Sequence, residues 1–345
     1  MSYKLIYSIL ALGSLTLATA CSSTEAIDDS PADGIAVRFT ARANDSRASI
    51  TTNSTITNIP FVVYGDMVPT ASASTATPTV IFPGTLVTYA DNAWQYADPQ
   101  YWFPNHTHSF VAIHTPAFEN ITNLTYSSGK LTFEYAAPTD YTKVPDILTA
   151  AHRRQYAPPA TSVTFNFGHT MARINFIAKI DASIPNQTIS IDRIVIKGIA
   201  SRASYSLQPA ALGTAKQTSD IVTPTWTISG TPTRIAYDKN IVETITTGQS
   251  AELFPVEDAL LVIPQTVTSD IEVELTYSRG GNSTTVSGRL RIPSASHGYA
   301  WAAGHSYSYS FTLGADDFLI FDIPIVKSWD EDEGGNYIVV DNQTN

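Results

Sequence analysis

Hydrophobic and polar residues alternate in many short stretches of this chain, a pattern typical of half-buried β-strands. In the first such stretch, residues 35–42, the apolar positions are Ile35, Val37, Phe39 and Ala41. The residues between them are mainly polar or basic. Because successive side chains of a strand point to opposite faces, the four apolar residues are predicted to face a core together.

The same alternation recurs along the rest of the sequence. Residues 161–180 contain the clearest pair of strands, separated by Gly168-His169-Thr170. Residues 86–96 predict a hairpin around Ala90-Asp91, and Gly280-Gly281-Asn282 predicts the turn of another. Residues 146–151 fit either a short helix or the end of a strand. Many short strands separated by turns favour β-sandwiches.

Length and composition suggest how these strands are divided. The chain has 345 residues, only 15% of them charged, and it is rich in the Thr, Ser, Tyr, Val and Ile that favour strands. This length exceeds one ordinary domain. We therefore expect an all-β protein with two tandem sandwiches of about seven strands each, over residues 35–181 and 182–345. Residues 181–187 are expected to link them.

The segment before the first strand carries a targeting signal. Lys4 precedes an apolar run from Leu5 to Leu17, and small residues lead to Cys21, the only cysteine of the chain. Residues 1–20 are therefore interpreted as a secretory signal peptide, too short for a membrane-spanning helix. A small residue, Ala20, directly before Cys21 resembles the lipobox of bacterial lipoproteins. This predicts cleavage between Ala20 and Cys21 and lipidation of Cys21, with an ordinary secretory peptide as the alternative.

Two polar segments flank the first strand. Residues 21–34 are acidic and are expected to form a flexible tether, which also resembles a surface-export signal of some outer-membrane lipoproteins. Residues 43–58 read as an exposed loop in which Arg47 is the last basic residue, and such loops are where proteases cut. The net charge of −11 argues against nucleic acid as a partner.

Candidate chemistry is sparse. His106 and His108 would share one face of a strand, but no cysteine or acidic cluster accompanies them, so a solvated loop is favoured over a metal site. Trp94 and Trp102 could form a sugar-stacking platform, although aromatic residues of this kind more often cap a sandwich core. The acidic run 330–336 lacks the ligand spacing of a calcium loop, and no Gly-x-Ser-x-Gly elbow is present. These observations predict no catalytic residues, no metal and no cofactor, and hence no enzyme.

Several further stretches form a recognisable pattern when they are taken together. They follow one another over nearly the whole chain, behind the lipoprotein signal. Their residues are Ser46-Arg47-Ala48-Ser49, Phe61-Val62-Val63-Tyr64, Trp94-Gln95-Tyr96, Tyr101-Trp102-Phe103-Pro104, Phe110-Val111-Ala112-Ile113, Asp146-Ile147-Leu148-Thr149-Ala150, 163–174, 260–265, 301–309 and Val326-Lys327-Ser328-Trp329.

Together these stretches resemble the fimbrillins of type V pili. The resemblance implies two transthyretin-like sandwiches and assembly by strand exchange. In that family an arginine-specific protease cuts after the first strand, and the groove left by this strand accepts a strand from a neighbouring subunit. Here the resemblance implies a removable strand containing Ile35, Val37, Phe39 and Ala41. It implies a cut at Arg47, or else at Arg42. Candidate donor residues are Tyr337, Ile338, Val339 and Val340.

The expected function is thus a structural and adhesive subunit of a surface fimbria. The protein would be an outer-membrane lipoprotein at the cell surface, its partners would be other fimbrial subunits, and a surface ligand remains open. Stalk, anchor and tip roles also remain open. The rival readings are a glycan-binding lipoprotein of a polysaccharide-uptake system, which needs exposed Trp94 and Trp102, and an enzyme, which needs a cleft with converging titratable groups.

Overall fold

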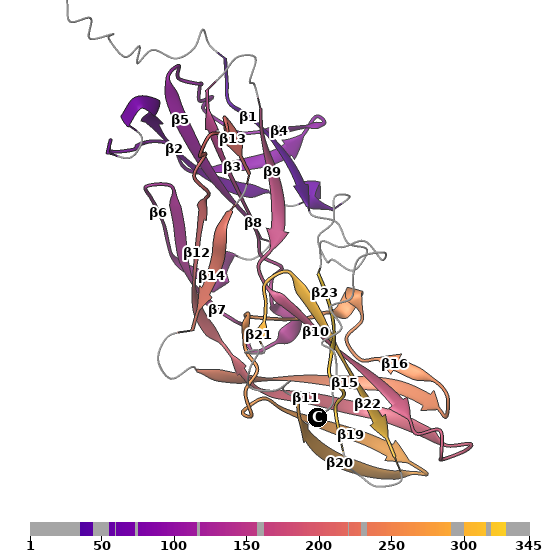
Figure 1. The fold of residues 1–345 in the computed structure, drawn as a ribbon. Helices are drawn as coiled ribbons and strands as arrows, with labels where there is room; N and C mark the ends of the chain where they lie inside the picture. The colour runs from indigo at the N-terminus through magenta and orange to yellow at the C-terminus, as the bar shows by residue number, and fades with distance from the viewer. Residues whose placement is uncertain are drawn as a thin grey trace, which may run out of the picture.

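The computed structural model consists almost entirely of β-strands (Figure 1). It describes residues 35–43, 55–58, 60–72, 75–115, 118–156, 162–219, 221–228, 233–290, 300–314 and 319–328. The signal peptide, Cys21, the 21–34 tether, Arg47 and the candidate donor residues 337–340 lie outside these ranges. Within them, the only helices are short 3₁₀ turns, and none could cross a bilayer. The all-β prediction is confirmed.

The upper part of the molecule in Figure 1 is built on an eight-stranded sheet, here called the central sheet. Its order is β1-β9-β8-β5-β2-β3-β4, and β13 pairs with β8. The strands are β1 (Arg38–Ala43), β2 (Phe61–Pro69), β3 (Thr79–Ala90), β4 (Ala93–Gln95), β5 (His106–His114), β8 (Leu148–Gln155), β9 (Ser162–His169) and β13 (Gln217–Thr218).

Both faces of the central sheet are covered. One face packs against the four-stranded cover sheet, in the order β14-β12-β7-β6, with strands β6 (Ile121–Ser127), β7 (Lys130–Ala136), β12 (Arg202–Pro209) and β14 (Ile221–Thr227). The hydroxyl groups of Thr149 and Tyr205 meet across this interface at 2.8 Å. On the other face, the sheet curls so that β1 and β9 close over β2, β3 and β5 around a separate core. All nine residues of β5 are therefore buried.

The lower part of Figure 1 is a second sandwich. Its five-stranded sheet has the order β16-β10-β22-β23, with β17 also paired to β10, and its four-stranded sheet has the order β15-β11-β19-β20. The first set is β10 (Ala172–Ile180), β16 (Ser250–Glu252), β17 (Leu260–Val262), β22 (His305–Leu313) and β23 (Ile325–Ser328); the second is β11 (Thr188–Ala200), β15 (Arg234–Thr246), β19 (Glu272–Arg279) and β20 (Asn282–Arg289).

Short elements complete the chain. A two-stranded ladder joins β18 (Gln265–Thr266) to β21 (Ala300–Trp301), and the 3₁₀ turns are η1 (Ile56–Asn58), η2 (Thr70–Ser72), η3 (Phe118–Asn120), η4 (Tyr141–Lys143) and η5 (Val256–Asp258). Both expected hairpins form. β3 turns into β4 at Asp91 and Asn92, and β19 turns into β20 at Gly280 and Gly281, all four with positive φ.

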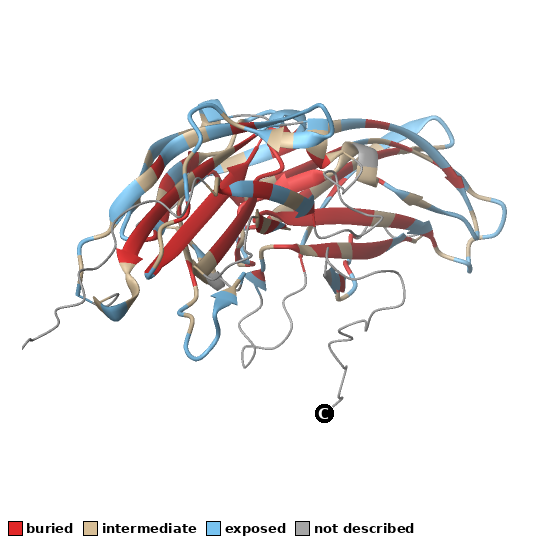
Figure 2. Ribbon diagram, turned by 90° about the horizontal axis from the view of Figure 1, so that it is seen from above, coloured by how far each residue is buried: buried red, intermediate tan, exposed pale blue. Residues whose placement is uncertain are grey.

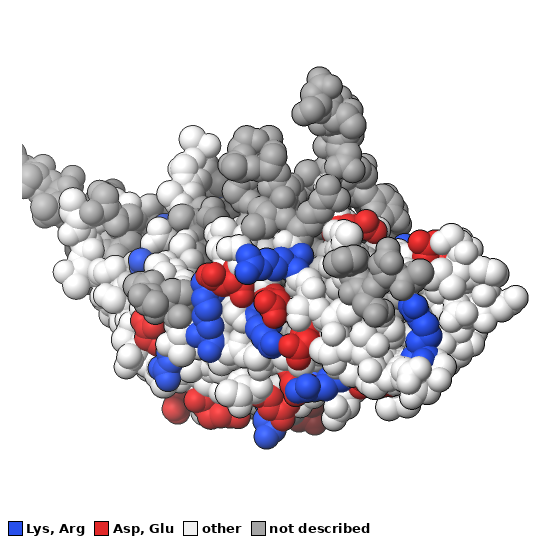
Figure 3. All heavy atoms as spheres, turned by 90° about the horizontal axis from the view of Figure 1, so that it is seen from below, with Lys and Arg blue, Asp and Glu red and all other residues white. Residues whose placement is uncertain are grey.

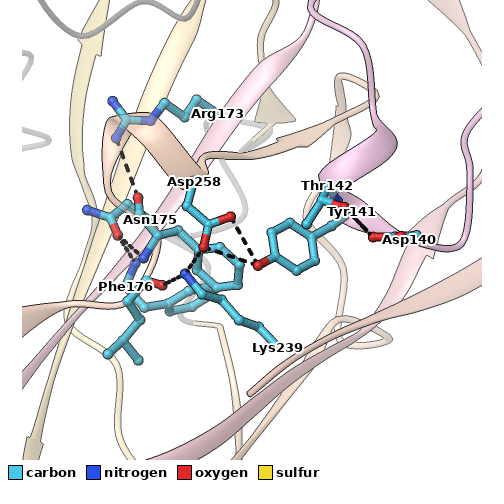
Figure 4. A network of polar contacts seen from close by, with 10 residues as sticks. Asp140, Tyr141, Thr142, Arg173, Asn175, Phe176, Lys239 and Asp258 are labelled. Atoms are coloured by element: carbon cyan, nitrogen blue, oxygen red, sulfur yellow. Dashed lines mark hydrogen bonds and ion pairs between the residues drawn. The ribbon is translucent and has the colours of Figure 1, made fainter. Parts of the chain in front are cut away.

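The two sandwiches share one hydrophobic cluster and a polar junction. The cluster runs from the face between the central and cover sheets into the lower sandwich. At the junction, Tyr141 of η4 donates to both carboxylate oxygens of Asp258, at 3.1 and 3.2 Å, and Lys239 of β15 lies 2.6 Å from the same carboxylate (Figure 4). The Tyr141 ring also packs edge-on against Phe254.

The strands differ from the sequence-based expectation in three ways. β9 and β10 are both strands but do not pair with each other, because the chain crosses from the central sheet to the lower sandwich between them. Residues 148–155 form a strand, so the helix alternative for residues 146–151 is wrong. The central sheet alone has eight strands, more than the seven expected for a whole sandwich. It gains β13 from beyond residue 200.

Pairing also crosses the position 181/182, where the sequence placed a boundary. β12 and β14 follow this position but join the cover sheet with β6 and β7, whereas β10 precedes it but pairs with β22. The division into 35–181 and 182–345 stays a prediction. The upper and the lower sandwich each contain strands from both sides of residue 181.

The surface is polar and mixed in charge. Buried residues lie on the facing strands and exposed residues on the outer strands and loops (Figure 2). Lys and Arg are interspersed with Asp and Glu on the face shown in Figure 3. Cross-strand pairs on the four-stranded lower sheet have this character, among them Arg193 with Asp238 and Lys197 with Glu274. Exposed pairs of this kind contribute little to stability, because water and salt screen them.

Candidate functional site

The first strand is the candidate site, and its side chains alternate as its sequence indicates. Val37 and Phe39 are buried, with 1% and 3% of their surface exposed. Ile35 and Ala41 are half-buried and pack against the same core. The intervening Arg38, Thr40 and Arg42 are exposed. The sequence missed one inward residue, Ala43, which is also buried.

Phe39 is the centre of the core beneath β1. Its ring lies 5.3 to 6.4 Å, between centroids, from five other aromatic rings contributed by β2, β3, β5, β9 and the segment after β4. These partners are Phe61, Phe82, Tyr96, Phe110 and Phe165. Full burial of one such side chain contributes about 1.5–3 kcal/mol. Without β1, the aromatic rings around Phe39 would line an open apolar groove.

β1 is the terminal strand of the central sheet. It pairs in parallel with β9 alone, from Arg38 opposite Ser162 to Ala43 opposite Phe167. β9 in turn pairs with β8 only at His169 and Gly168. Residues 162–167 of β9 therefore have β1 as their only strand partner within the described residues. Loss of β1 would leave their N–H and C=O groups as a template for another strand.

A second set of contacts clamps the beginning of β1. The Val37 N–H donates to the Gln100 carbonyl at 2.8 Å, and the Tyr96 hydroxyl donates to the Val37 carbonyl at 2.5 Å. The Trp102 N–H donates to the Ile35 carbonyl at 3.1 Å. Residues 35–37 are thus hydrogen-bonded on the side away from β9. Residues 38–43 pair with β9 on one side and form the edge of the sheet on the other. Gln100 was not singled out from the sequence, and Tyr96 entered there only as part of the stretch Trp94-Gln95-Tyr96, without a role of its own.

The candidate cleavage residues lie in different settings. Arg42 is exposed but belongs to β1, where it is paired opposite Asn166. Arg47 follows in residues 44–54, outside the described ranges, as do Ala20, Cys21 and the candidate donor residues Tyr337, Ile338, Val339 and Val340. The roles of all these residues stay predictions.

The aromatic and histidine residues near β1 do not form a ligand platform. Trp102 is fully buried, its indole 4.9 Å from the His108 ring, so the interpretation as core is confirmed for Trp102. Trp94 is half-buried against Phe61. A paired Trp94/Trp102 sugar platform is therefore excluded.

His106 and His108 belong to buried strand β5, so the prediction of a solvated loop is wrong. Burial, with a smaller contribution from His106, lowers the pKa of His108 to about 3. Burial, with a contribution from Arg154, also lowers the pKa of His152 to about 4. No group of three or more His, Cys, Asp or Glu residues that could hold a metal occurs in the described ranges.

Comparison with known proteins adds a family. A family model described as "Fimbrillin-like" matches residues 42–329. Among curated proteins, none matches the sequence.

Several solved structures are distantly similar to this chain. A candidate cell adhesion protein of Bacteroides ovatus has 12% identity and a TM-score of 0.47, covering 85% of this chain and 97% of its own. One of Bacteroides uniformis has 17% identity and a TM-score of 0.43, covering 86% and 98%. A candidate polysaccharide-binding protein of Bacteroides thetaiotaomicron has 9% identity and a TM-score of 0.36, covering 85% and 96%. At this level of likeness, no role is transferred from them.

Proposed function

The chain belongs to the fimbrillin-like family, and from this premise we propose that it is a structural and adhesive subunit of a bacterial surface fimbria. It reaches the surface as a lipoprotein attached through Cys21, after cleavage behind Ala20. Several acyl chains would anchor it firmly, whereas a single chain binds a membrane only marginally. Family membership supports an adhesive surface protein and not an enzyme.

Assembly proceeds by exchange of the first strand. The observation that carries this proposal is the position of Phe39. Its side chain packs among five aromatic rings, and it belongs to β1, the strand at the edge of the sheet. An edge strand can leave without breaking the order of the strands behind it. The vacated groove offers both apolar sockets and the free main-chain groups of β9, which is what an added strand requires.

Cleavage after β1 is the trigger. A protease needs a stretch of chain it can hold in extended form, and loops supply this more readily than paired strands. Arg42 is held in the β1–β9 ladder, which disfavours it as the first point of attack. Arg47 lies beyond the end of β1 at Ala43 and is the preferred site.

The incoming strand is that of another subunit, for which Tyr337, Ile338, Val339 and Val340 are the proposed donor residues. Successive side chains of a strand point to opposite faces, so either Tyr337 and Val339 or Ile338 and Val340 would enter the sockets of the groove. A subunit that stays uncut would act as an anchor, and one that donates no strand would act as a tip. Stalk subunit is the role proposed here.

The test is limited digestion of the purified unlipidated protein, residues 22–345, with an arginine-specific protease. We expect one early cut after Arg47, followed by a ladder of oligomers on a sizing column. The matched variants are Arg47→Ala, which should remove both the cut and the ladder, and Arg42→Ala, which should leave both unchanged. A cut without association, or association that survives Arg47→Ala, would count against strand exchange.

A further inference from the structure

A cavity of about 580 Å³, lined by both polar and apolar residues, lies on the opposite face of the central sheet from the β1 core. Its volume falls within the range of about 300–1,000 Å³ typical of small-molecule sites. Nothing in the proposed assembly uses it. Six of the residues that line it belong to the central sheet, namely Asp66, Val68, Thr107, Ser109, Arg153 and Gln155.

These six residues form two rows across three neighbouring strands. Asp66 of β2, Ser109 of β5 and Arg153 of β8 are paired side by side in the first row. Val68, Thr107 and Gln155 make the second row in the same register. Further along β5 the same face is apolar, with Val111 and Ile113 in the core against the cover sheet. The inner face of the sheet thus changes from apolar to polar where the cavity begins.

The first row holds opposite charges that are kept apart. Adjacent strands are about 4.8 Å apart, so the backbones of Asp66 and Arg153 are separated by about 10 Å. Between them, Ser109 Oγ accepts from Arg153 Nε at 3.0 Å. Asp66 is only 3% exposed, and its Oδ2 has no hydrogen-bond partner within the described residues. Burial raises the pKa of the Asp66 carboxyl. The neighbouring Tyr126 hydroxyl opposes this shift most, followed by the Gly129 main chain and the charge of Arg153.

The walls of the cavity are held in place. The loop 210–216 is tied to β8, because the Gln155 N–H donates to the Lys216 carbonyl at 2.9 Å and Arg153 Nη1 donates to the Ala210 carbonyl at 3.4 Å. The loop itself is closed by a bond from the Ala215 N–H to the Leu212 carbonyl. On the other side, the Thr70 and Thr107 hydroxyls meet at 3.2 Å. An ordered cavity binds without first having to be organised.

We propose that this cavity binds a neutral, polyhydroxylated ligand, namely a saccharide unit. A single anion would meet the buried carboxylate of Asp66, and a single cation would meet the guanidinium of Arg153. Neighbouring hydroxyl groups instead both donate and accept, so one ring can donate to the Asp66 carboxylate where it lines the cavity and accept from Arg153. The hydroxyls of Thr70 and Ser128 and the amide of Gln155 extend this polar lining, and Val68 and Leu212 offer apolar contacts to ring C–H groups.

The cavity and the β1 groove lie on opposite faces of the central sheet and use different residues of β5. Ser109 and Thr107 line the cavity, whereas Phe110 and Ala112 line the groove. Saccharide binding therefore goes beyond assembly and does not depend on it. It can be measured on the uncut monomer.

The experiment is ligand-observed NMR on uncut protein, residues 22–345. The neutral probes are galactose, N-acetylglucosamine and maltose at millimolar concentration, with glucuronate, glucosamine and glycylglycine as the anionic, cationic and zwitterionic probes. Asp66→Asn removes the charge without changing the shape, and Ala211→Trp places an indole at the mouth, since Ala211 lines the cavity. Asp192→Asn, on the lower sandwich, is the matched control.

We expect at least one neutral probe to bind, with affinity about tenfold or more weaker in Asp66→Asn, as for loss of a hydrogen bond to a charged group. Ala211→Trp should abolish binding, and Asp192→Asn should leave it unchanged. Thermal unfolding of each variant separates a lost site from a lost fold, and Ala211→Trp keeps the test decisive if Asp66→Asn unfolds. The proposal is overturned if no neutral probe binds, if a charged probe binds more tightly, or if binding is indifferent to Ala211→Trp.

Discussion

At the scale of single residues, burial decides what each side chain contributes. Phe39 is in contact with five rings, while its neighbour Thr40 is exposed and reaches only Thr164, by a hydroxyl pair at 3.0 Å. The two residues are adjacent in sequence and belong to the same strand. Substituting each of them in turn therefore separates the contribution of core packing to stability from the contribution of the strand's backbone.

Phe39→Ala should lower the free energy of unfolding by about 3–5 kcal/mol, because it removes a buried ring and leaves a cavity. Thr40→Ala should change it by about 0.5 kcal/mol or less. Urea unfolding followed by far-ultraviolet circular dichroism measures both. Similar losses in the two variants would mean that β1 is held by its backbone and that the groove matters little.

The buried histidine rings predict acid sensitivity. The pKa of His152 is lowered to about 4 from the 6.5 of a free histidine. Between these values the unfolded chain binds a proton that the folded chain does not, so stability falls as pH falls from about 6.5 to about 4. Neither ring nitrogen of His152 has a partner within the described residues, so an apolar replacement loses no hydrogen bond.

His152→Leu should therefore be at least as stable as the natural protein at pH 7, and should lose less stability on acidification to pH 4.5. His108, whose pKa is lowered to about 3, keeps part of the pH dependence in this variant. Urea unfolding at the two pH values gives the comparison. An unchanged difference between pH 7 and pH 4.5 would remove His152 as a cause.

At the scale of elements, β1 is held unevenly along its length. Its end at Ala43 is an edge, and its beginning is clamped by Tyr96, Gln100 and Trp102. After a cut beyond Ala43, the freed strand should peel from this end while the clamp still holds. If exchange proceeds as proposed, we expect release of the cut peptide, and not the cut itself, to limit its rate.

Tyr96→Phe should speed release of the cut peptide about two- to tenfold, since it removes one hydrogen bond worth about 0.5–1.5 kcal/mol. Tyr101→Phe is the matched control, because Tyr101 lies next to the clamp on the exposed surface. Mass spectrometry of sizing-column fractions over time measures the rate. Equal rates for the two variants would show that the clamp does not control exchange.

At the scale of the whole molecule, the two sandwiches are joined by packing. One cluster of buried residues spans both, and Tyr141 connects the upper sandwich to Phe254 and Asp258 of the lower one (Figure 4). A shared core favours unfolding in a single transition.

Tyr141→Ala should lower the free energy of unfolding by about 3 kcal/mol, because it removes a mostly buried ring at the junction. Lys143→Ala, on the exposed part of the same turn, should have little effect. Tryptophan fluorescence and circular dichroism should give coincident transitions for the natural protein. Separate midpoints in the natural protein would mean that the two halves are not coupled.

Strand positions and the facing of side chains followed largely from sequence. The alternation in residues 35–42 correctly placed Val37 and Phe39 inward and Arg38 and Arg42 outward. Residues needing positive φ marked the turn at Gly280-Gly281. The exposure expected for His106 and His108 was wrong, because the polar character of a side chain does not reveal that a strand is covered on both faces.

The sequence by itself determined the all-β class, the inward side of the first strand and the family, because strand period and turn chemistry are local properties that can be read within a few residues. Only the tertiary structure decided that β1 pairs with β9 across more than a hundred residues, that β9 and β10 belong to different sheets, and that Asp66 and Arg153 face one cavity. An alternating pattern states that one face of a strand is buried. It does not state which distant strand buries that face, since this depends on the packing of the whole chain.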